Sequence, residues 1–567
     1  MRLLILLLCA TLPGCGPPGP PVTPPAARQA EAERFMVSAA HPLAVEAGVD
    51  ILRRGGNAVD AAVAVQMMLG FVEAPETGIG GGGFLLYRDA ARGTVEVFDG
   101  RETAPAAARP DRFTLFGLPV PRWVAIPSGR SVGVPGLVAM LGLAHDRHGS
   151  LPWATLLQPA IAATEQGLPM PGRLARESRG DPSLRLFADT RRAFVAPAGA
   201  TEPVLRSEAY AATLRTLARE GPRAFYEGPI AASVVERARA RRPWRSDLEV
   251  SDLRDYRAIE RAALCGRYRQ WTVCGAPPPS SGGIAILQAL GVLEHFPVAE
   301  LGPGSVEAIH LLAEAQRLAF ADRERYLGDP AFVDVPTDAL IDPTYLSRRA
   351  ALIDPRRAMR SAPHGDPAGA RVRGAGDAVP AAPAGGTSHF SVVDAEGNAV
   401  ALTASIETPF GSRMTSDGFL LNNQLTDFSF TPRAGGLPHP NAVAPGKRPR
   451  SSMSPVIVLD TQGEVRLVVG ARGGPRIIAY VLKVLVGVLD WDLGIQEAIE
   501  LPNFTHLAGR LELERGSRLA ARGVELEALG HRVRQAELTS GLHGIEATAA
   551  GWRGGADPRL EGVARGE

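Results

Sequence analysis

The sequence predicts a layered α+β protein with a large apolar interior. Apolar residues make up 45% of the 567 residues and charged residues 21%, a balance that is typical of folded proteins and not of disordered ones. Helical spacing of apolar residues dominates the first part of the chain, whereas alternating spacing occurs in pairs of segments after residue 387. Strand pairs mixed with helices favour stacked layers over a regular βαβ repeat.

Six segments carry the spacing and the end signals of helices. Gly55 and Gly56 end the first, and Asn57 is a suitable N-cap for the second. Pro159 is expected in the first turn of the third, where a proline is well tolerated. The sixth is strongly apolar and is expected to lie buried between layers. The predicted helices span residues 41–52, 58–71, 159–166, 210–220, 306–326 and 476–489.

Two strand pairs are predicted in the C-terminal part of the chain, because apolar and polar residues alternate there on both sides of short polar turns. Each pair is expected to form a hairpin, the first around residues 394–398 and the second around Gln462 and Gly463. The predicted strands span residues 389–393, 399–406, 456–459 and 465–469.

The first residues have the features of a secretory signal. An arginine precedes the apolar run Leu3 to Ala10, which is too short to span a bilayer. Leu12 to Cys15 matches a bacterial lipobox apart from an unusual proline, so Cys15 is expected to carry a lipid; ordinary signal cleavage beside a chance cysteine is the alternative. We therefore expect a signal at 1–14, a proline-rich tether at 15–34, and an exported bacterial protein that is periplasmic or membrane-tethered.

Composition excludes several classes of function. The 61 basic and 60 acidic residues give a formal net charge of +1, which argues against nucleic-acid binding. Four cysteines are too few for a disulfide scaffold, although Cys265 and Cys274 flank a possible hairpin and could be either bonded or free. The 11 histidines form no evident ligand cluster in the sequence, so neither a metal nor another cofactor is expected.

Two glycine motifs fit known patterns by letter only. Residues 78–83 fit G-x-G-x-x-G, but the strand-like residues 84–87 follow where a dinucleotide site needs a helix. Residues 129–133 fit G-x-S-x-G, but flanking prolines are incompatible with the strand-turn-helix setting of a serine elbow. Neither a dinucleotide site nor a nucleophilic serine is predicted.

The segment around Thr387 carries the most specific chemical signal. Residues 365–386, rich in alanine, glycine and proline, are predicted to form a flexible linker that ends in two glycines before Thr387 and a strand. Attack of the Thr387 hydroxyl on the Gly386 carbonyl would give an ester, and its hydrolysis would free the Thr387 α-amine. That amine, with a reference pKa of about 7.7–8.0, could act as the base for its own hydroxyl. Taken alone, the tripeptide favours an ordinary loop that enters a strand.

The wider context of Thr387 closely resembles the γ-glutamyltransferase family. Residues 387–394 and 397–411 resemble the family signature, and the resemblance extends over about residues 35–560. Further matching segments are 55–62, 78–84, 101–105, 133–136, 277–283, 421–424, 448–455 and 473–474. The resemblance implies an N-terminal-nucleophile hydrolase with a four-layer αββα sandwich. It implies one domain built from a large-subunit region, 35–386, and a small-subunit region, 387–567.

The resemblance also implies the catalytic groups. Thr387 would be the residue at which the chain is cut, after Gly386, and then the nucleophile. Ser405 occupies the position of a second family threonine that hydrogen-bonds the nucleophile. The backbone N–H groups of Gly473 and Gly474 would form the oxyanion hole.

Substrate-binding roles follow from the same resemblance. Arg101 would pair with the substrate α-carboxylate, and Asp427, helped by Gln424, would hold the α-amino group. Glu407 stands where many members have asparagine, and its carboxylate should favour the amine and repel the carboxylate. Two further residues would hydrogen-bond the substrate carboxylate: Ser451 and Ser452. Residues 428–447 look shorter than in members with a lid loop, which implies a more open pocket.

The implied function is a self-processing γ-glutamyltransferase or glutathione hydrolase that passes a γ-glutamyl group from a Thr387 acyl-enzyme to water or an amino acid. Its partners would be small-molecule γ-glutamyl compounds and the two subunits of one precursor, without a cofactor. Two alternatives within the family are a cephalosporin (glutaryl) acylase and a poly-γ-glutamate-processing enzyme. An alternative from another class is a non-catalytic surface binding lipoprotein.

Overall fold

The computed structural model describes residues 27–196, 200–241, 244–370, 386–507 and 509–567. The predicted signal, Cys15, most of the predicted tether and linker residues 371–385 lie outside the described residues. None of the described helices combines the length and the apolar character needed to cross a membrane.

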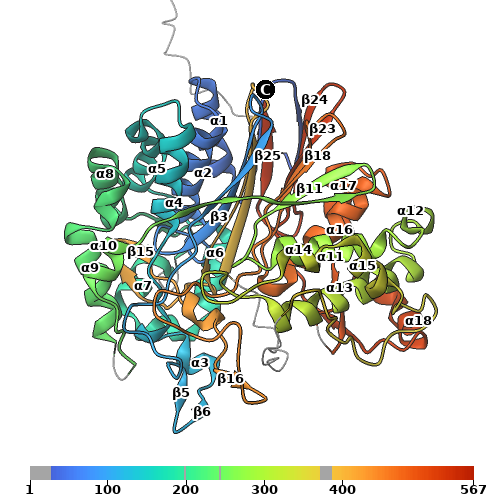
Figure 1. Cartoon of the computed structure of the whole chain (residues 1–567). Helices are drawn as coiled ribbons and strands as arrows, with labels where there is room; N and C mark the ends of the chain where they lie inside the picture. Colours follow the sequence, from blue (N-terminus) through green and yellow to red (C-terminus); the bar gives the residue numbers. More distant parts are fainter. Residues whose placement is uncertain (1–26, 197–199, 242–243, 371–385, 508) are drawn as a thin grey trace, which may run out of the picture.

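Two antiparallel sheets, each with seven strands among the described residues, face each other in the centre of the molecule (Figure 1). The first sheet has the order β25 (Val563–Gly566), β2 (Met36–Ala39), β12 (Gly386–Val393), β13 (Ala399–Glu407), β3 (Gly82–Asp89), β4 (Thr94–Asp99) and β9 (Ile259–Ala262). The second has the order β1 (Gln29–Ala32), β24 (Gly551–Ala556), β23 (His543–Thr548), β19 (Val465–Gly470), β18 (Val456–Leu459), β11 (Trp271–Gly275) and β10 (Leu264–Tyr268).

Helices cover the outer face of each sheet (Figure 1). The principal helices over the first sheet are α1 (Pro42–Arg53), α2 (Ala58–Val72), α4 (Leu137–His148), α5 (Trp153–Gln166), α8 (Glu208–Glu220) and α9 (Gly228–Ala240). Those over the second are α11 (Gly282–Leu293), α13 (Val306–Tyr326), α15 (Pro343–Ala350), α16 (Ile477–Leu489), α17 (Ile495–Glu500) and α18 (Gly523–Ala528). The predicted α+β class and the four αββα layers are confirmed.

Apolar side chains fill the space between the two sheets. Phe84 and Leu86 of the first sheet pack in one buried cluster with Ile457, Val468 and Ile545 of the second. There are two larger clusters, one between the first sheet and its helices and one between the second sheet and its helices. Each sheet is therefore apolar on both faces, which explains why β12 and β13 are buried along their whole length.

Strands from before and after Thr387 are neighbours in both sheets. In the first sheet, β12 and β13 lie between β2 and β3; in the second, β18 pairs with β11. Because neither half of the chain forms a complete sheet among the described residues, the two halves share one folded body.

The predicted helices and strands are largely confirmed, and the third helix needs correction. Asn57 caps α2 with a reciprocal capping box to Asp60. Helix α5 begins at Trp153, so Pro159 lies inside the helix and not in its first turn. Leu156 and Leu157 are fully buried, and their packing holds the additional turns in place.

The N-terminal tether also needs correction. Strand β1 pairs with β24 along its length, so the folded body begins before residue 34, where the tether was expected to end. The backbone N–H groups of Arg34 and Phe35 donate to the carbonyl oxygen of Glu567, which places the start and the end of the described body side by side. Backbone pairing gives this segment partners that its composition does not reveal.

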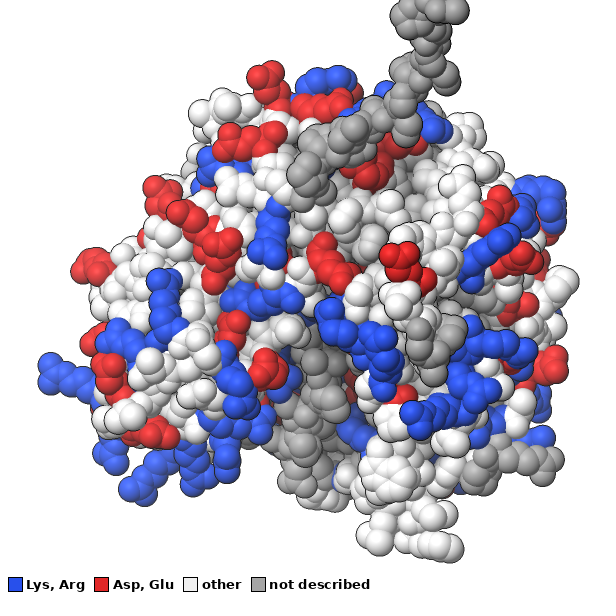
Figure 2. All heavy atoms as spheres, turned by 180° about the vertical axis from the view of Figure 1, so that it is seen from behind, with Lys and Arg blue, Asp and Glu red and all other residues white. Residues whose placement is uncertain are grey.

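Cys265 and Cys274 lie opposite each other on β10 and β11 and are joined by a disulfide. On the face shown in Figure 2, basic and acidic side chains are intermixed, and basic ones are more numerous in its lower part. This mixture is in keeping with the near-zero net charge.

Candidate active site

Thr387 lies near the start of β12, buried in the middle of the first sheet. It pairs with Ser405 of β13, and the register shifts between Gly386 and Thr387. The Thr387 hydroxyl donates to Ser405 Oγ at 3.2 Å, and Ser405 Oγ donates to the Gly386 carbonyl oxygen at 2.6 Å. Ser405 therefore contacts both the predicted nucleophile and the carbonyl that it would attack.

A glycine run supports this arrangement from β3. A β-carbon at Gly81 would lie 2.2 Å from the Ser405 carbonyl oxygen, so a side chain there would displace β13. Residues 78–81 form a turn that leads into strand β3. A strand therefore follows the glycine motif where a dinucleotide site needs a helix. Ser131, from the G-x-S-x-G match, is buried and donates to the backbone oxygens of Ile126 and Ser128, so it is no exposed nucleophile.

The Thr387 backbone N–H donates to Glu76 Oε2 at 3.0 Å, a contact that the sequence analysis missed. Arg472 pairs with the same carboxylate oxygen at 2.6 Å, and Arg173 pairs with the other. Burial raises the pKa of Glu76, and the charge of Arg173 opposes that rise. The one sequence signal is that Glu73 and Glu76 interrupt a stretch without other charges between residues 61 and 87.

Arg101 and Asp427, predicted to bind opposite ends of a substrate, form an ion pair with each other. The Arg101 side chain is fully buried, and its Nε donates to the Pro449 carbonyl oxygen at 3.0 Å. The Asp427 side chain is 30% exposed. Gln424 Nε2 donates to Asp427 Oδ2 at 3.1 Å. The structure thus brings these three predicted residues together, with Asp427 on the accessible side.

Glu407 lies beside this group at the end of β13. Its backbone has a φ of +84°, and Asn423 Nδ2 donates to its carboxylate. Burial, followed by the negative charge of Asp427, raises the pKa of Glu407 to about 7. Close to neutral pH this carboxylate therefore changes between the neutral and the charged form.

Ser451 and Ser452 differ in their surroundings. Ser451 Oγ accepts from the Met453 backbone N–H at 3.1 Å, and its carbonyl oxygen accepts from Ser281 Oγ at 2.6 Å. Ser452 Oγ accepts from Arg323 Nη2 at 2.7 Å, so its own O–H proton stays available for donation. Ser281 and Arg323 are further supporting residues that the sequence analysis missed.

Gly473 and Gly474 lie in the turn that follows β19, with φ values of +124° and +60°. Their neighbour Arg472 binds the Glu76 oxygen that also accepts from the Thr387 N–H. The Glu76 carboxylate therefore links the residue before the glycine turn to the start of β12.

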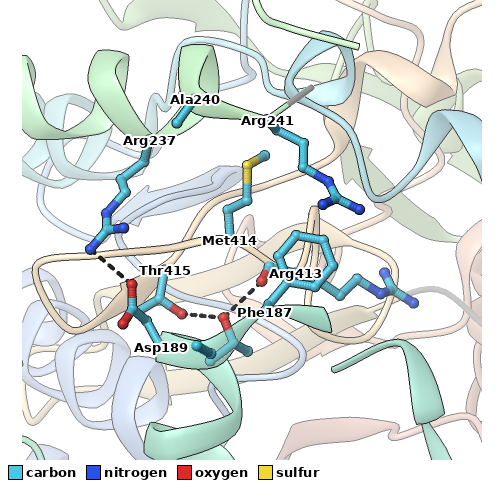
Figure 3. A pocket seen from close by; sticks show the side chains of 10 residues that line it. Phe187, Asp189, Arg237, Ala240, Arg241, Arg413, Met414 and Thr415 are labelled. Carbon is cyan, nitrogen blue, oxygen red and sulfur yellow. Dashed lines mark hydrogen bonds and ion pairs between the residues drawn. The ribbon is translucent and has the colours of Figure 1, made fainter. Parts of the chain in front are cut away.

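A cavity of about 200 Å³ lies near Arg413, on the side of the loop that follows Glu407 (Figure 3). Arg413 Nη1 donates to Thr408 Oγ1 at 2.9 Å, and Arg413 also pairs with Asp181. None of the predicted site residues lines this cavity. Arg413 in its wall thus contacts the loop that follows Glu407, and neither Arg101 nor Asp427 lines the cavity.

The fold and the buried threonine at the start of a central strand define an N-terminal-nucleophile hydrolase. The chain matches the family model described as gamma-glutamyltranspeptidase over residues 44–567, and it belongs to this family of enzymes.

Three relatives illustrate the range of this similarity. The chain is 36% identical to the glutathione hydrolase proenzyme of Escherichia coli K12, over 96% of this chain and 94% of that protein. It is 34% identical to the acylase ACY 1 proenzyme of Pseudomonas sp. SE83, over 94% of each chain. The crystal structure of cephalosporin acylase from Bacillus halodurans superposes with a TM-score of 0.82 at 25% identity, over 97% of this chain and 98% of that one. These relatives are named as enzymes, which argues against the non-catalytic alternative.

The raised pKa of Glu407 predicts a pH-dependent effect on stability. The carboxyl is ionised more readily in the unfolded chain, so its contribution to stability is lost as the pH rises through about 7. Replacing Glu407 with glutamine should change the free energy of unfolding little at pH 5 and raise it by on the order of 2–3 kcal/mol at pH 8. Chemical denaturation at both pH values measures this. Glu537→Gln, at a side chain that is 80% exposed, is the control and should give no such difference; an equal effect of both variants would contradict the prediction.

Proposed function

We propose that the chain cuts itself between Gly386 and Thr387 and that Thr387 then transfers γ-glutamyl groups. The observation that carries this proposal is the hydrogen-bonded path from Thr387 Oγ1 through Ser405 Oγ to the Gly386 carbonyl oxygen. Ser405 polarises the carbonyl that the hydroxyl attacks. The C–N bond of Gly386–Thr387 breaks, the nitrogen takes a proton, and water hydrolyses the resulting ester.

In the cut enzyme, the Thr387 α-amine acts as the base for its own hydroxyl. The hydroxyl attacks the γ-carbonyl of glutathione or a related amide, the Gly473 and Gly474 N–H groups stabilise the oxyanion, and the amine leaves with a proton. Water or an amino acid then takes the γ-glutamyl group from the acyl-enzyme. The two chains, one ending at Gly386 and the other beginning at Thr387, remain one body because strands of both are neighbours in each sheet.

Donor recognition is assigned to the Arg101–Asp427 pair. The donor carboxylate binds Arg101 with help from the serine hydroxyls at 451 and 452, and the donor α-amine binds Asp427 with help from Gln424. The charge of Glu407 next to Asp427 adds attraction for the amine. This favours γ-glutamyl donors over glutaryl donors, which have a carboxylate but no amine.

A poly-γ-glutamate-processing role is the second candidate within the family. The segment that follows Asp427 carries only the short strands β16 (Arg433–Ala434) and β17 (Leu437–Pro438), and it is fixed by Asn441 Nδ2, which donates to the Asp427 carbonyl oxygen. A short, anchored segment leaves room for longer donors. Comparing glutathione with γ-linked glutamate oligomers tests this role.

Export with a lipid at Cys15 remains part of the proposal. The disulfide between Cys265 and Cys274 supports an oxidising compartment.

Thr387→Ala should leave one uncut chain without γ-glutamyltransferase activity, because both cleavage and catalysis need its hydroxyl. Denatured mass and N-terminal sequencing of the signal-free protein measure the cut, and glutamate release from glutathione measures the activity. Wild type should give a smaller chain that begins at Thr387. Normal cutting of the variant would refute the assignment.

Ser405→Ala should slow self-cleavage by roughly 10- to 100-fold, because it removes the hydrogen bond to the Gly386 carbonyl oxygen. Ser405→Thr keeps a hydroxyl and should cut at a rate close to that of wild type. A time course of freshly purified precursor on a denaturing gel measures both. Equal rates for the alanine and threonine variants would show that the hydroxyl has no role.

Glu76→Gln should lower the pKa of the Thr387 α-amine, because it removes a negative charge and leaves Arg173 and Arg472 nearby. The acidic limb of the kcat/KM profile should move down by about one pH unit. Glu177→Gln is the comparison variant: Glu177 binds Arg173 and also acts on Glu76 but does not contact Thr387, so it should move the limb less. An unmoved limb in Glu76→Gln, or the same shift in both variants, would contradict this role.

A further inference from the structure

A buried histidine cluster lies on the outer side of the second sheet, where α13 meets α18 (Figure 1). His310 and Glu314 come from one face of α13. His506 directly follows β20 (Phe504–Thr505), and His531 lies between α18 and β22 (Val533–Ala536). All four side chains are at most 4% exposed. The expectation that the histidines form no cluster is therefore wrong, because residues far apart in the sequence meet here.

Glu314, His506 and His531 converge on one point. A ligand atom from each lies within 4.8 Å of the other two. In a tetrahedral zinc site with bonds of about 2.1 Å, neighbouring ligand atoms are roughly 3.4 Å apart. Side-chain rotations that move each group by about 1 Å would close this difference.

The hydrogen bonds of His310 determine which nitrogen of His531 has a lone pair. His310 Nε2 lies 2.8 Å from the Asp354 carbonyl oxygen, which can only accept, so Nε2 carries the proton. His310 Nδ1 then accepts from His531 Nε2, at 2.8 Å. His531 Nδ1 is left unprotonated, and it has no hydrogen-bond partner among the described residues. A histidine that binds a metal through one ring nitrogen usually donates the N–H of its other ring nitrogen to a neighbouring group, as His531 Nε2 does to His310.

His506 provides the second, independent observation. Both of its ring nitrogens are buried without a hydrogen-bond partner among the described residues, and one of them must hold a lone pair. A neutral imidazole has one such nitrogen. Two unsatisfied buried nitrogens are costly in a folded protein, and a bound cation would satisfy one of them.

We propose that Glu314, His506 and His531 bind a divalent cation of borderline softness, with Zn²⁺ as the best fit to two imidazoles and one carboxylate. Arg317 donates to Glu314 Oε1 at 2.7 Å, and its charge opposes the cation. The Met359 backbone N–H donates to Glu314 Oε2 at 2.7 Å. Each carboxylate oxygen has a second lone pair, so Glu314 can keep both contacts and still bind the metal. Arg317 thus weakens binding without blocking a ligand position.

The site has a structural role. Glu314 and Arg323, which supports Ser452, are nine residues apart on α13, or about 14 Å along the helix. The ion therefore does not take part in the reaction. If the chain is cut as proposed, Glu314 belongs to the large chain and both histidines to the small chain, so the ion cross-links the two chains. Only this last role rests on the proposed function.

Zinc titration of metal-stripped protein without a histidine tag tests the site, with a chromophoric chelator as competitor. Wild type should bind one equivalent, the His506→Gln/His531→Gln double variant less than a tenth of one, and His295→Gln, at an exposed residue, the wild-type amount. Equal binding by wild type and the double variant would overturn the proposal. Uncut Thr387→Ala protein should also bind one equivalent, so a failure of the cleavage proposal would be seen separately.

Cobalt binding to wild type gives a readout that does not depend on the folding of the double variant. Stoichiometric Co²⁺ at this site should produce the intense visible absorption of a four-coordinate ion, and added Zn²⁺ should remove it. The absence of that absorption, or only the weak spectrum of hydrated Co²⁺, would overturn the proposal. Zinc should also raise the Tm of the cut wild-type protein by several degrees without changing its γ-glutamyltransferase rate.

Discussion

The start of β12 is the constraint on which the rest of the site depends. The ladder with β13 holds Thr387 opposite Ser405, while the register shift leaves the Gly386 carbonyl oxygen within 2.6 Å of Ser405 Oγ. A β-carbon at Gly386 would lie 2.6 Å from the Thr408 carbonyl carbon, so only glycine fits this position. The Gly386–Thr387 peptide bond of this buried strand thus lies beside the hydroxyl groups of Thr387 and Ser405. The rigidity of the sheet fixes that geometry.

The charges around this strand couple the two halves of the chain. Glu76 and Arg173 precede the proposed cut, and Arg472 follows it. All three are buried, and both arginines pair with the Glu76 carboxylate that accepts from the Thr387 N–H. Buried ions are stable only when they are paired, and separating the halves would remove one of the two arginines that pair with Glu76. The same interaction that positions the threonine therefore opposes dissociation of the two regions. The shared sheets and the shared ion pairs both hold the two regions together.

Sequence patterns identified what is local and missed what depends on packing. The cap at Asn57 and the β12–β13 pair follow from spacing and turn residues, whereas the role expected of Thr387 rests on the family resemblance. Glu76 contacts a residue 311 positions away, and Arg323 reaches Ser452 across 129 positions. No periodicity encodes such contacts. The helix around Pro159 shows the same limit in another form, because burial of neighbouring leucines outweighs the local preference of proline.

The Arg101–Asp427 pair also bears on how a donor is selected. The two groups already satisfy each other, so a donor must replace an existing ion pair and gains little from attraction alone. A donor with both a carboxylate and an amine restores a partner to each group. On the proposed roles, a donor with only a carboxylate takes Arg101 and leaves Asp427 beside Glu407 without its ion-pair partner. If Arg101 and Asp427 bind the donor as proposed, the cost of that lost partner discriminates between γ-glutamyl and glutaryl groups more than any added attraction does.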